Sequence, residues 1–157
     1  KYKLLIFNLL YNFIFNNFRE ILMIENFNGI IYLVIFLLLL LINSFYAFNT
    51  LFNTKNFLSK YGVDISAAFF TRFVGAFIST VVLMQLYILF RGTVATWAFF
   101  NFMFVAMTLI SIVNFYSFEI DKLGRTPLAT RESWIPTSIL AILWAILCFG
   151  LADKIYM

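Results

Sequence analysis

Four long apolar segments, separated by short polar ones, constrain the fold of this chain more than any other feature. They cover about residues 30–52, 65–90, 94–118 and 135–152. Each is close to or above the roughly 20 residues that an α-helix needs to cross the hydrocarbon core of a membrane. The pattern predicts an all-α fold, an integral membrane four-helix bundle over residues 29–157.

The composition also favours a membrane environment. Hydrophobic residues make up 64% and charged residues 11% of the chain, whereas a soluble domain carries about 45–50% and about 25%. A folded domain of this size still exposes roughly a third of the surface of its unfolded chain. So many apolar side chains cannot all be hidden from water. We therefore expect an integral membrane protein of a bacterial inner membrane or of an energy-converting organelle membrane.

Polar residues and turn formers mark the ends of the segments. Asp64 or Ser66 is suited to cap the second segment, and Pro136 fits the first turn of the fourth. The connection at about residues 91–93 is very short, which predicts that the second and third segments are antiparallel neighbours. The flanking basic residues divide equally between the two sides of the membrane, so the positive-inside rule does not orient the chain. One side holds Lys1, Lys3, Arg19, Arg91 and Lys154, and the other holds Lys55, Lys60, Lys122, Arg125 and Arg131.

Residues 1–28 lie outside the four segments and have a different pattern. Asn8, Asn12, Asn16 and Arg19 are spaced so that they lie along one face of a helix. Apolar residues occupy the other faces, which predicts an amphipathic helix in the membrane interface or against a partner. A fifth span and a targeting segment are the alternatives.

Several classes of chemistry lack the residues that they require. The chain has no His, and its only Cys is Cys148. This excludes imidazole-bound metals, Ser-His-Asp and Cys-His catalysis and an internal disulfide. The sequence has no glycine-rich phosphate loop, and its formal charge of +4 is too dispersed for a nucleic-acid surface. We therefore expect no enzymatic activity, no metal, no intrinsic cofactor and no nucleic-acid partner.

Arg72 is the most informative charged residue. It follows Asp64 by eight positions, about 12 Å along a helix, which places it near the hydrocarbon boundary. A charge at mid-membrane costs about 2.5–3.5 kcal/mol, so such residues face the bundle interior or reach for the interface. Glu119, at the end of the third segment, is the predicted partner. A fold-locking ion pair or a lipid-headgroup contact is one interpretation, and a substrate, anion or proton site is the other.

Uncharged polar residues and small residues also occupy defined helix faces. Asn101, Thr108 and Ser111 share a face of the third segment, where interhelical hydrogen bonds and a polar pathway are alternatives. A track of small residues beside Arg72 suits close helix packing; it consists of Ala68, Gly75, Ala76 and Ser79. Further uncharged polar residues inside the segments are Asn43, Gln85 and Asn114.

The aromatic residues fall into two groups. Trp and Tyr lie mainly toward segment ends, at the expected headgroup level, whereas the 22 Phe residues are spread along and around the helices. Phe-rich faces suit contact with lipids, pigments or other integral membrane subunits. We therefore expect a non-catalytic accessory subunit of a larger respiratory or photosynthetic membrane complex. The alternative is a small transporter or channel that uses Arg72 and the polar face of the third segment.

One loop and the helix after it resemble a known family. The residues are Leu51-Phe52-Asn53, then Tyr61-Gly62-Val63-Asp64, then Arg72 and Gly75. They are similar to the small four-span membrane proteins of the DoxX-like group and related families of unknown function, over about residues 30–152. Thr54 stands where that group usually has a loop proline. The resemblance implies a four-helix bundle without established catalytic chemistry.

Overall fold

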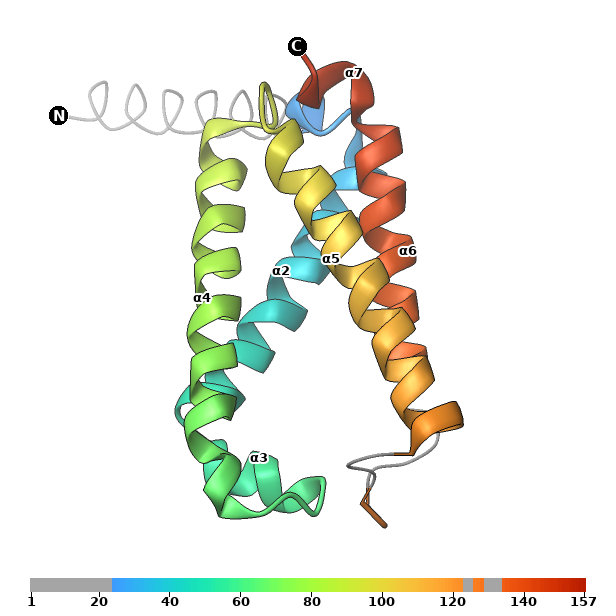
Figure 1. Ribbon diagram of the computed structural model, residues 1–157. Coiled ribbons are helices and arrows are strands. Elements are labelled where there is room, and N and C mark those ends of the chain that lie inside the picture. The colour runs from blue at the N-terminus through green and yellow to red at the C-terminus, as the bar shows by residue number, and fades with distance from the viewer. Residues whose placement is uncertain (1–23, 123–125, 129–133) are drawn as a thin grey trace, which may run out of the picture.

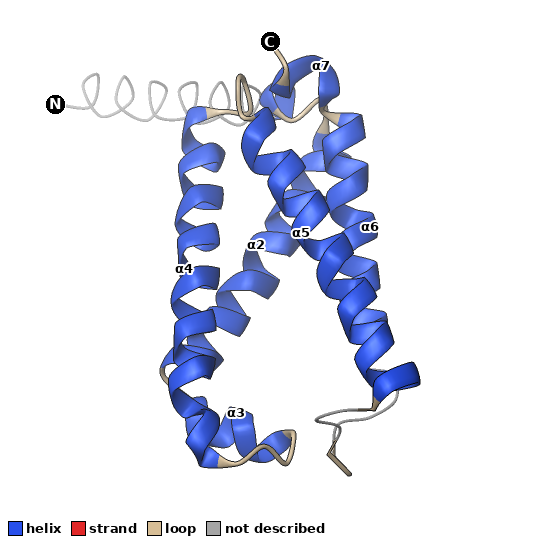
Figure 2. Cartoon of the chain, in the orientation of Figure 1, coloured by secondary structure: helices blue, strands red, loops and turns tan. Residues whose placement is uncertain are grey.

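The computed structural model describes residues 24–122, 126–128 and 134–157 (Figure 1). These residues form helices and no strands (Figure 2), so the predicted all-α fold is confirmed. The helices are α2 (Ile30–Leu51), α3 (Thr54–Lys60), the 3₁₀ turn η1 (Ile65–Ala67), α4 (Ala68–Arg91), α5 (Trp97–Phe115), the π-helical turn η2 (Tyr116–Asp121), α6 (Trp134–Gly150) and α7 (Ala152–Ile155). The amphipathic helix predicted over residues 1–28 lies outside the described residues except for its last five.

Three of these helices are long and apolar enough to cross a membrane. They are Ile30–Leu51, Ile65–Arg91 and Trp97–Asp121, of 22, 27 and 25 residues. The fourth apolar helix, α6, has 17 residues, about 25 Å at 1.5 Å per residue, which is shorter than the roughly 30 Å hydrocarbon core. The structure therefore establishes three candidate spans, and α6 is a shorter apolar helix that packs on α5.

The helices associate as two pairs. Helix α2 packs mainly on α4, α5 packs mainly on α6, and a smaller contact joins α2 to α6. Helices α4 and α5 run antiparallel, as the short connection predicts, but their contact is small: the rings of Phe77 and Phe102 lie 6.4 Å apart, and in Figure 1 the two helices diverge away from α7. The predicted antiparallel direction is therefore confirmed, whereas each of the two helices packs mainly on another helix. A short turn fixes the direction of two helices, whereas the side chains decide which faces pack.

The apolar core lies toward the end of the molecule that carries α7. Its largest fully buried side chains include Phe27, Phe36, Phe100 and Trp144. The rings of Phe27 and Phe36 lie 4.9 Å apart, and the ring of Phe100 lies 6.0 Å from both Phe36 and Trp144. Aromatic rings at these separations attract each other beyond the effect of burial alone. This cluster joins the two helix pairs.

A tight turn leads into α2 at the same end. The N–H of Gly29 donates to the carbonyl of Ile24, and the N–H of Asn28 donates to that of Glu25. Asn28 has a positive φ of 53°, and together these features form a Schellman motif, which ends the preceding helical residues 24–26. The Nδ2 of Asn28 also donates to the carbonyl of Gly150 (3.2 Å). The turn therefore ties the start of α2 to the end of α6.

At the opposite end, the region after α2 differs from the prediction. Residues 53–56 were predicted as the polar end of the first segment, but the chain continues there as α3, whose Leu58 side chain is buried. The predicted cap of the next helix is confirmed, because the carboxylate of Asp64 accepts from the N–H of Ser66 at 2.8 Å. This hydrogen bond holds the pKa of Asp64 below its ordinary value.

Most polar side chains within the long helices are satisfied by their own helix. A Ser, Thr or Asn side chain there donates to the carbonyl three or four residues earlier, so its polar atoms need no water. The residues that do so are Ser44, Asn49, Thr50, Thr71, Ser79, Thr80, Thr108, Thr137 and Ser138. These polar residues are therefore compatible with an apolar environment.

Candidate functional site

Arg72 lies on the exposed side of α4, near its start. Its Nε donates to the Oγ1 of Thr54 at 3.3 Å. Thr54 is buried, and its hydroxyl donates to the carbonyl of Thr50 at 2.7 Å. The guanidinium is therefore anchored to the junction of α2 and α3.

The structure does not bring Arg72 and Glu119 together. Glu119 lies in η2, where its Oε1 accepts from the indole Nε1 of Trp134 at 3.3 Å. Within the described part of the chain, Arg72 makes its bond to Thr54 and no ion pair. The two residues belong to different helix pairs, which separate at this end of the molecule.

The predicted polar face of α5 lies largely against α6. Asn101 Nδ2 donates to Tyr156 Oη at 2.7 Å, and Asn101 Oδ1 accepts from Cys148 Sγ at 2.8 Å. The hydroxyls of Ser111 and Ser138 lie 2.5 Å apart. These contacts join the two helices and leave the polar groups engaged in packing.

Two further polar residues lie on α5 near its contact with α6, which we call the α5–α6 seam. Asn114 Nδ2 donates to Thr137 Oγ1 at 3.3 Å, one turn beyond the serine pair. Thr108, which the sequence groups with Asn101, donates instead to the carbonyl of Phe104 in its own helix at 2.8 Å. The predicted face therefore divides into residues that bind α6 and one that does not.

A second polar contact lies between α2 and α4. Asn43 Nδ2 donates to Gln85 Oε1 at 2.8 Å, and both side chains are buried. The Nε2 of Gln85 is fully buried and has no hydrogen-bond partner among the described residues. The sequence identifies both residues as polar, but their pairing depends on how the two helices are rotated against each other.

In the predicted track of small residues, Gly75 contributes most to the close packing of α2 on α4. A Cβ atom at Gly75 would lie 2.6 Å from Thr50 Oγ1 and 3.0 Å from the side chain of Leu51, so only glycine allows α2 and α4 this close. Ser79 and Ala68 are half-buried, whereas Ala76 is exposed and does not serve the predicted packing. Fewer residues of the track therefore serve helix packing than predicted.

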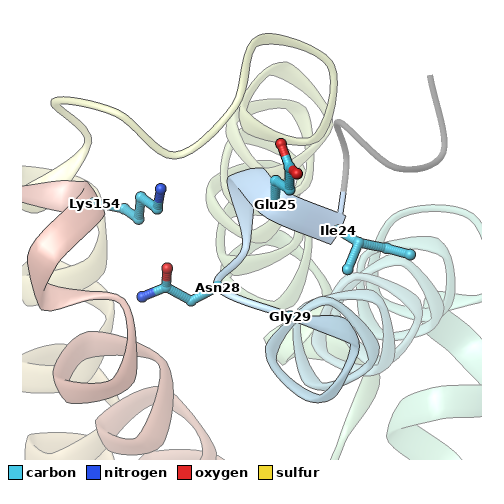
Figure 3. Close-up of a pocket in the computed structure, with 5 residues that line it drawn as sticks. All are labelled: Ile24, Glu25, Asn28, Gly29 and Lys154. Carbon is cyan, nitrogen blue, oxygen red and sulfur yellow. The ribbon is translucent and has the colours of Figure 1, made fainter. Parts of the chain in front are cut away.

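A shallow hollow lies where α2 begins (Figure 3). It holds about 370 Å³ and is lined by Ile24, Glu25, Asn28, Gly29 and Lys154. The Nδ2 of Asn28 donates to Gly150 and to the carboxylate of Asp153, which occupies both of its donor hydrogens. The charged groups that line the hollow are the carboxylate of Glu25 and the ammonium of Lys154. In the described residues, no three acidic or thiol side chains gather as a metal site would require.

No protein-family model, curated protein or solved structure matches the chain. The resemblance to the DoxX-like group therefore stays a prediction. What the geometry establishes is an all-helical, apolar chain whose interior polar groups mostly join helices.

Proposed function

We propose that the chain is a non-catalytic accessory subunit of a larger respiratory or photosynthetic membrane complex. In this proposal it crosses the membrane four times, in a bacterial inner membrane or an organelle membrane. It supplies packing surface to other subunits and contacts lipids or pigments, and it carries no cofactor of its own. The three candidate spans and the apolar α6 beside α5 support the membrane location.

The observation that carries the subunit proposal is the small amount of helix surface that the chain buries in itself. Helix α5 has 19 residues, of which only Phe100 and Met103 are buried. The two helix pairs meet at the α7 end and diverge beyond it (Figure 1). Surfaces that would face each other in a self-contained bundle are therefore available to a partner.

The exposed residues fit a protein partner within the membrane. Phe69, Phe70 and Phe73, in the first turns of α4, are 73%, 70% and 69% exposed. Inside a bilayer there is no hydrophobic driving force between helices, and association depends on close packing. Large flat rings offer much contact area for that packing. We propose this first part of α4 as the main partner surface.

The test is retention of the chain in its native complex. A tagged chain is solubilised in a mild detergent, and blue-native electrophoresis measures whether it migrates with a complex that carries haem or chlorophyll absorbance. We expect constant stoichiometry with that complex. A stable, monodisperse free chain, with nothing bound, would contradict the proposal.

Matched variants locate the surface. We expect Phe69→Ala with Phe73→Ala to lower retention at least several-fold, since buried aromatic anchors dominate interfaces. Leu38→Ala with Leu41→Ala removes side chains that are also exposed, on α2, and should leave retention unchanged. Equal losses from both pairs would argue against a partner surface on α4.

The alternative, a small transporter or channel, has less support. It requires Arg72 and the polar face of α5 to act on one pathway, whereas Arg72 binds Thr54 and Asn101 binds Tyr156 and Cys148. These residues lie on different helix pairs and toward opposite ends of the molecule.

A further inference from the structure

Arg72 occupies a depth at which its charge needs a partner. The span that contains it has 27 residues, about 40 Å, against a hydrocarbon core of roughly 30 Å. If the span is centred, the Cα of Arg72 lies about 5 Å inside the nearer boundary. Side chains on a helix tilt toward its N-terminus, which here is that nearer boundary. The guanidinium can thus reach the headgroup level while its stem lies among apolar groups.

One nitrogen of the guanidinium is anchored to α3. Gly75 lets α2 approach α4 closely, which places Thr50 and Thr54 beside the start of α4. The hydroxyl of Thr54 is fixed by its bond to the carbonyl of Thr50 and accepts from Arg72 Nε. A chain of buried contacts therefore positions this exposed side chain.

The two terminal nitrogens of Arg72 remain for an external anion. Among the described residues the side chain makes no ion pair, and Asp64, the acidic residue nearest in sequence, caps the N–H of Ser66. A guanidinium presents two parallel donors that match a phosphate group. The neighbouring helix α3 adds two exposed lysines, Lys55 and Lys60, and no acidic residue.

We propose that Arg72 binds the phosphate of an anionic phospholipid, whose acyl chain lies along the exposed rings of Phe69 and Phe73 and fills part of the contact between α4 and its partner subunit. The exposed rings beside the cation favour a lipid over free phosphate. The positive charge of α3 favours an anionic headgroup over a zwitterionic one. This site rests on the membrane location proposed above and gives its lipid contacts a defined position and chemistry.

The experiment is lipid titration of the full chain in a neutral detergent, with native mass spectrometry to count bound lipids. Phosphatidylglycerol and phosphatidylcholine are the probes. We expect the wild-type chain to prefer phosphatidylglycerol and Arg72→Gln to weaken its binding about tenfold, the loss typical of a charge-assisted pair. Arg91→Gln is the matched control, since Arg91 lies at the other end of the same helix and donates to the carbonyl of Val94. Unchanged binding by Arg72→Gln, or an equal loss in Arg91→Gln, would overturn the proposal.

Two further variants keep the test decisive if Arg72→Gln fails to fold. Thr54→Val retains the charge but removes the anchor, and Arg72→Lys retains the charge but not the paired donors. Both should bind phosphatidylglycerol a few-fold more weakly than the wild-type chain, and unchanged binding by both would refute the site. An excess of inorganic phosphate should not displace the lipid, and displacement would assign the site to a free anion instead. Lipid binding is measured on the chain alone, so its failure is distinct from failure to migrate with a complex.

Discussion

At the scale of single residues, the buried amide pair between α2 and α4, Asn43 and Gln85, can be tested directly by substitution. Asn43 donates to Gln85, whose own Nε2 has no partner among the described residues. Asn43→Leu would leave the whole Gln85 amide unpaired in apolar surroundings. We expect it to lower the free energy of unfolding by about 1–2 kcal/mol, the range for an unmade buried hydrogen bond.

The double variant, Asn43→Leu with Gln85→Leu, separates this effect from lost packing. It removes both polar groups at similar volume, so it should restore most of the stability lost in Asn43→Leu. Unfolding of the full chain in mixed detergent micelles, followed by Trp fluorescence, measures both. A double variant as unstable as the single one would indicate that shape, not the unpaired amide, governs this position.

Which residues matter could be predicted from the sequence, but not what they touch. Arg72 and Gln85 are conspicuous because polar groups are rare in apolar segments. Their partners depend on helix rotation and on which helices pair, which the pattern along one helix does not encode. Glu119 was a reasonable partner for Arg72 only while α4 and α5 were expected to pack together. Thr54, the residue that Arg72 does contact, gives no signal of its own in the sequence.

At the scale of helices, the seam between α5 and α6 offers a matched comparison. Asn101 bonds to Tyr156 and Cys148 across the seam, whereas Thr108 bonds only within its own helix. We expect Asn101→Leu to destabilise the chain by about 1 kcal/mol, since interhelical hydrogen bonds in membranes are modest. Thr108→Val should cost less than about 0.5 kcal/mol, because its carbonyl partner already accepts from the helix backbone.

The same unfolding measurement checks both variants. Trp97 stacks on Tyr156 with ring centroids 6.4 Å apart, so Asn101→Leu should also change Trp fluorescence in the folded chain. Equal losses of stability from the two substitutions would contradict the distinction between a bond across the two helices and a bond within one helix.

Helix positions were predicted better than helix contacts. Hydrophobicity and caps place α2, the span Ile65–Arg91 that η1 and α4 form together, and the start of α6 to within a residue or two of the structure, because these signals are local. Helix α3 was missed because a seven-residue helix leaves too short a pattern, and its polar residues look like a loop. The pairing of α2 with α4 rests on Gly75 meeting Thr50, a match between distant positions.

At the scale of the whole molecule, helix α6 decides how many times the chain crosses the membrane. Its 17 residues alone fall short of a typical span. However, α6 stays beside α5 at both ends: Phe115 and Trp134 are in ring contact at one end, and Asn101 and Cys148 are bonded at the other. A helix that follows α5 over this distance must share its depth, so we expect four crossings.

Accessibility to an impermeant maleimide in sealed vesicles tests this topology. Single cysteines replace lysine or arginine in a Cys148→Ala parent, since Cys148 is the only native thiol. We expect Lys55→Cys and Lys122→Cys to react from one side, and Arg91→Cys and Lys154→Cys from the other. The pair Lys55 and Arg91 flanks α4, the longest candidate span, and controls for vesicle orientation. Reaction of Lys154→Cys on the same side as Lys122→Cys would mean that α6 re-enters without crossing, because an even number of passes would then separate those two positions.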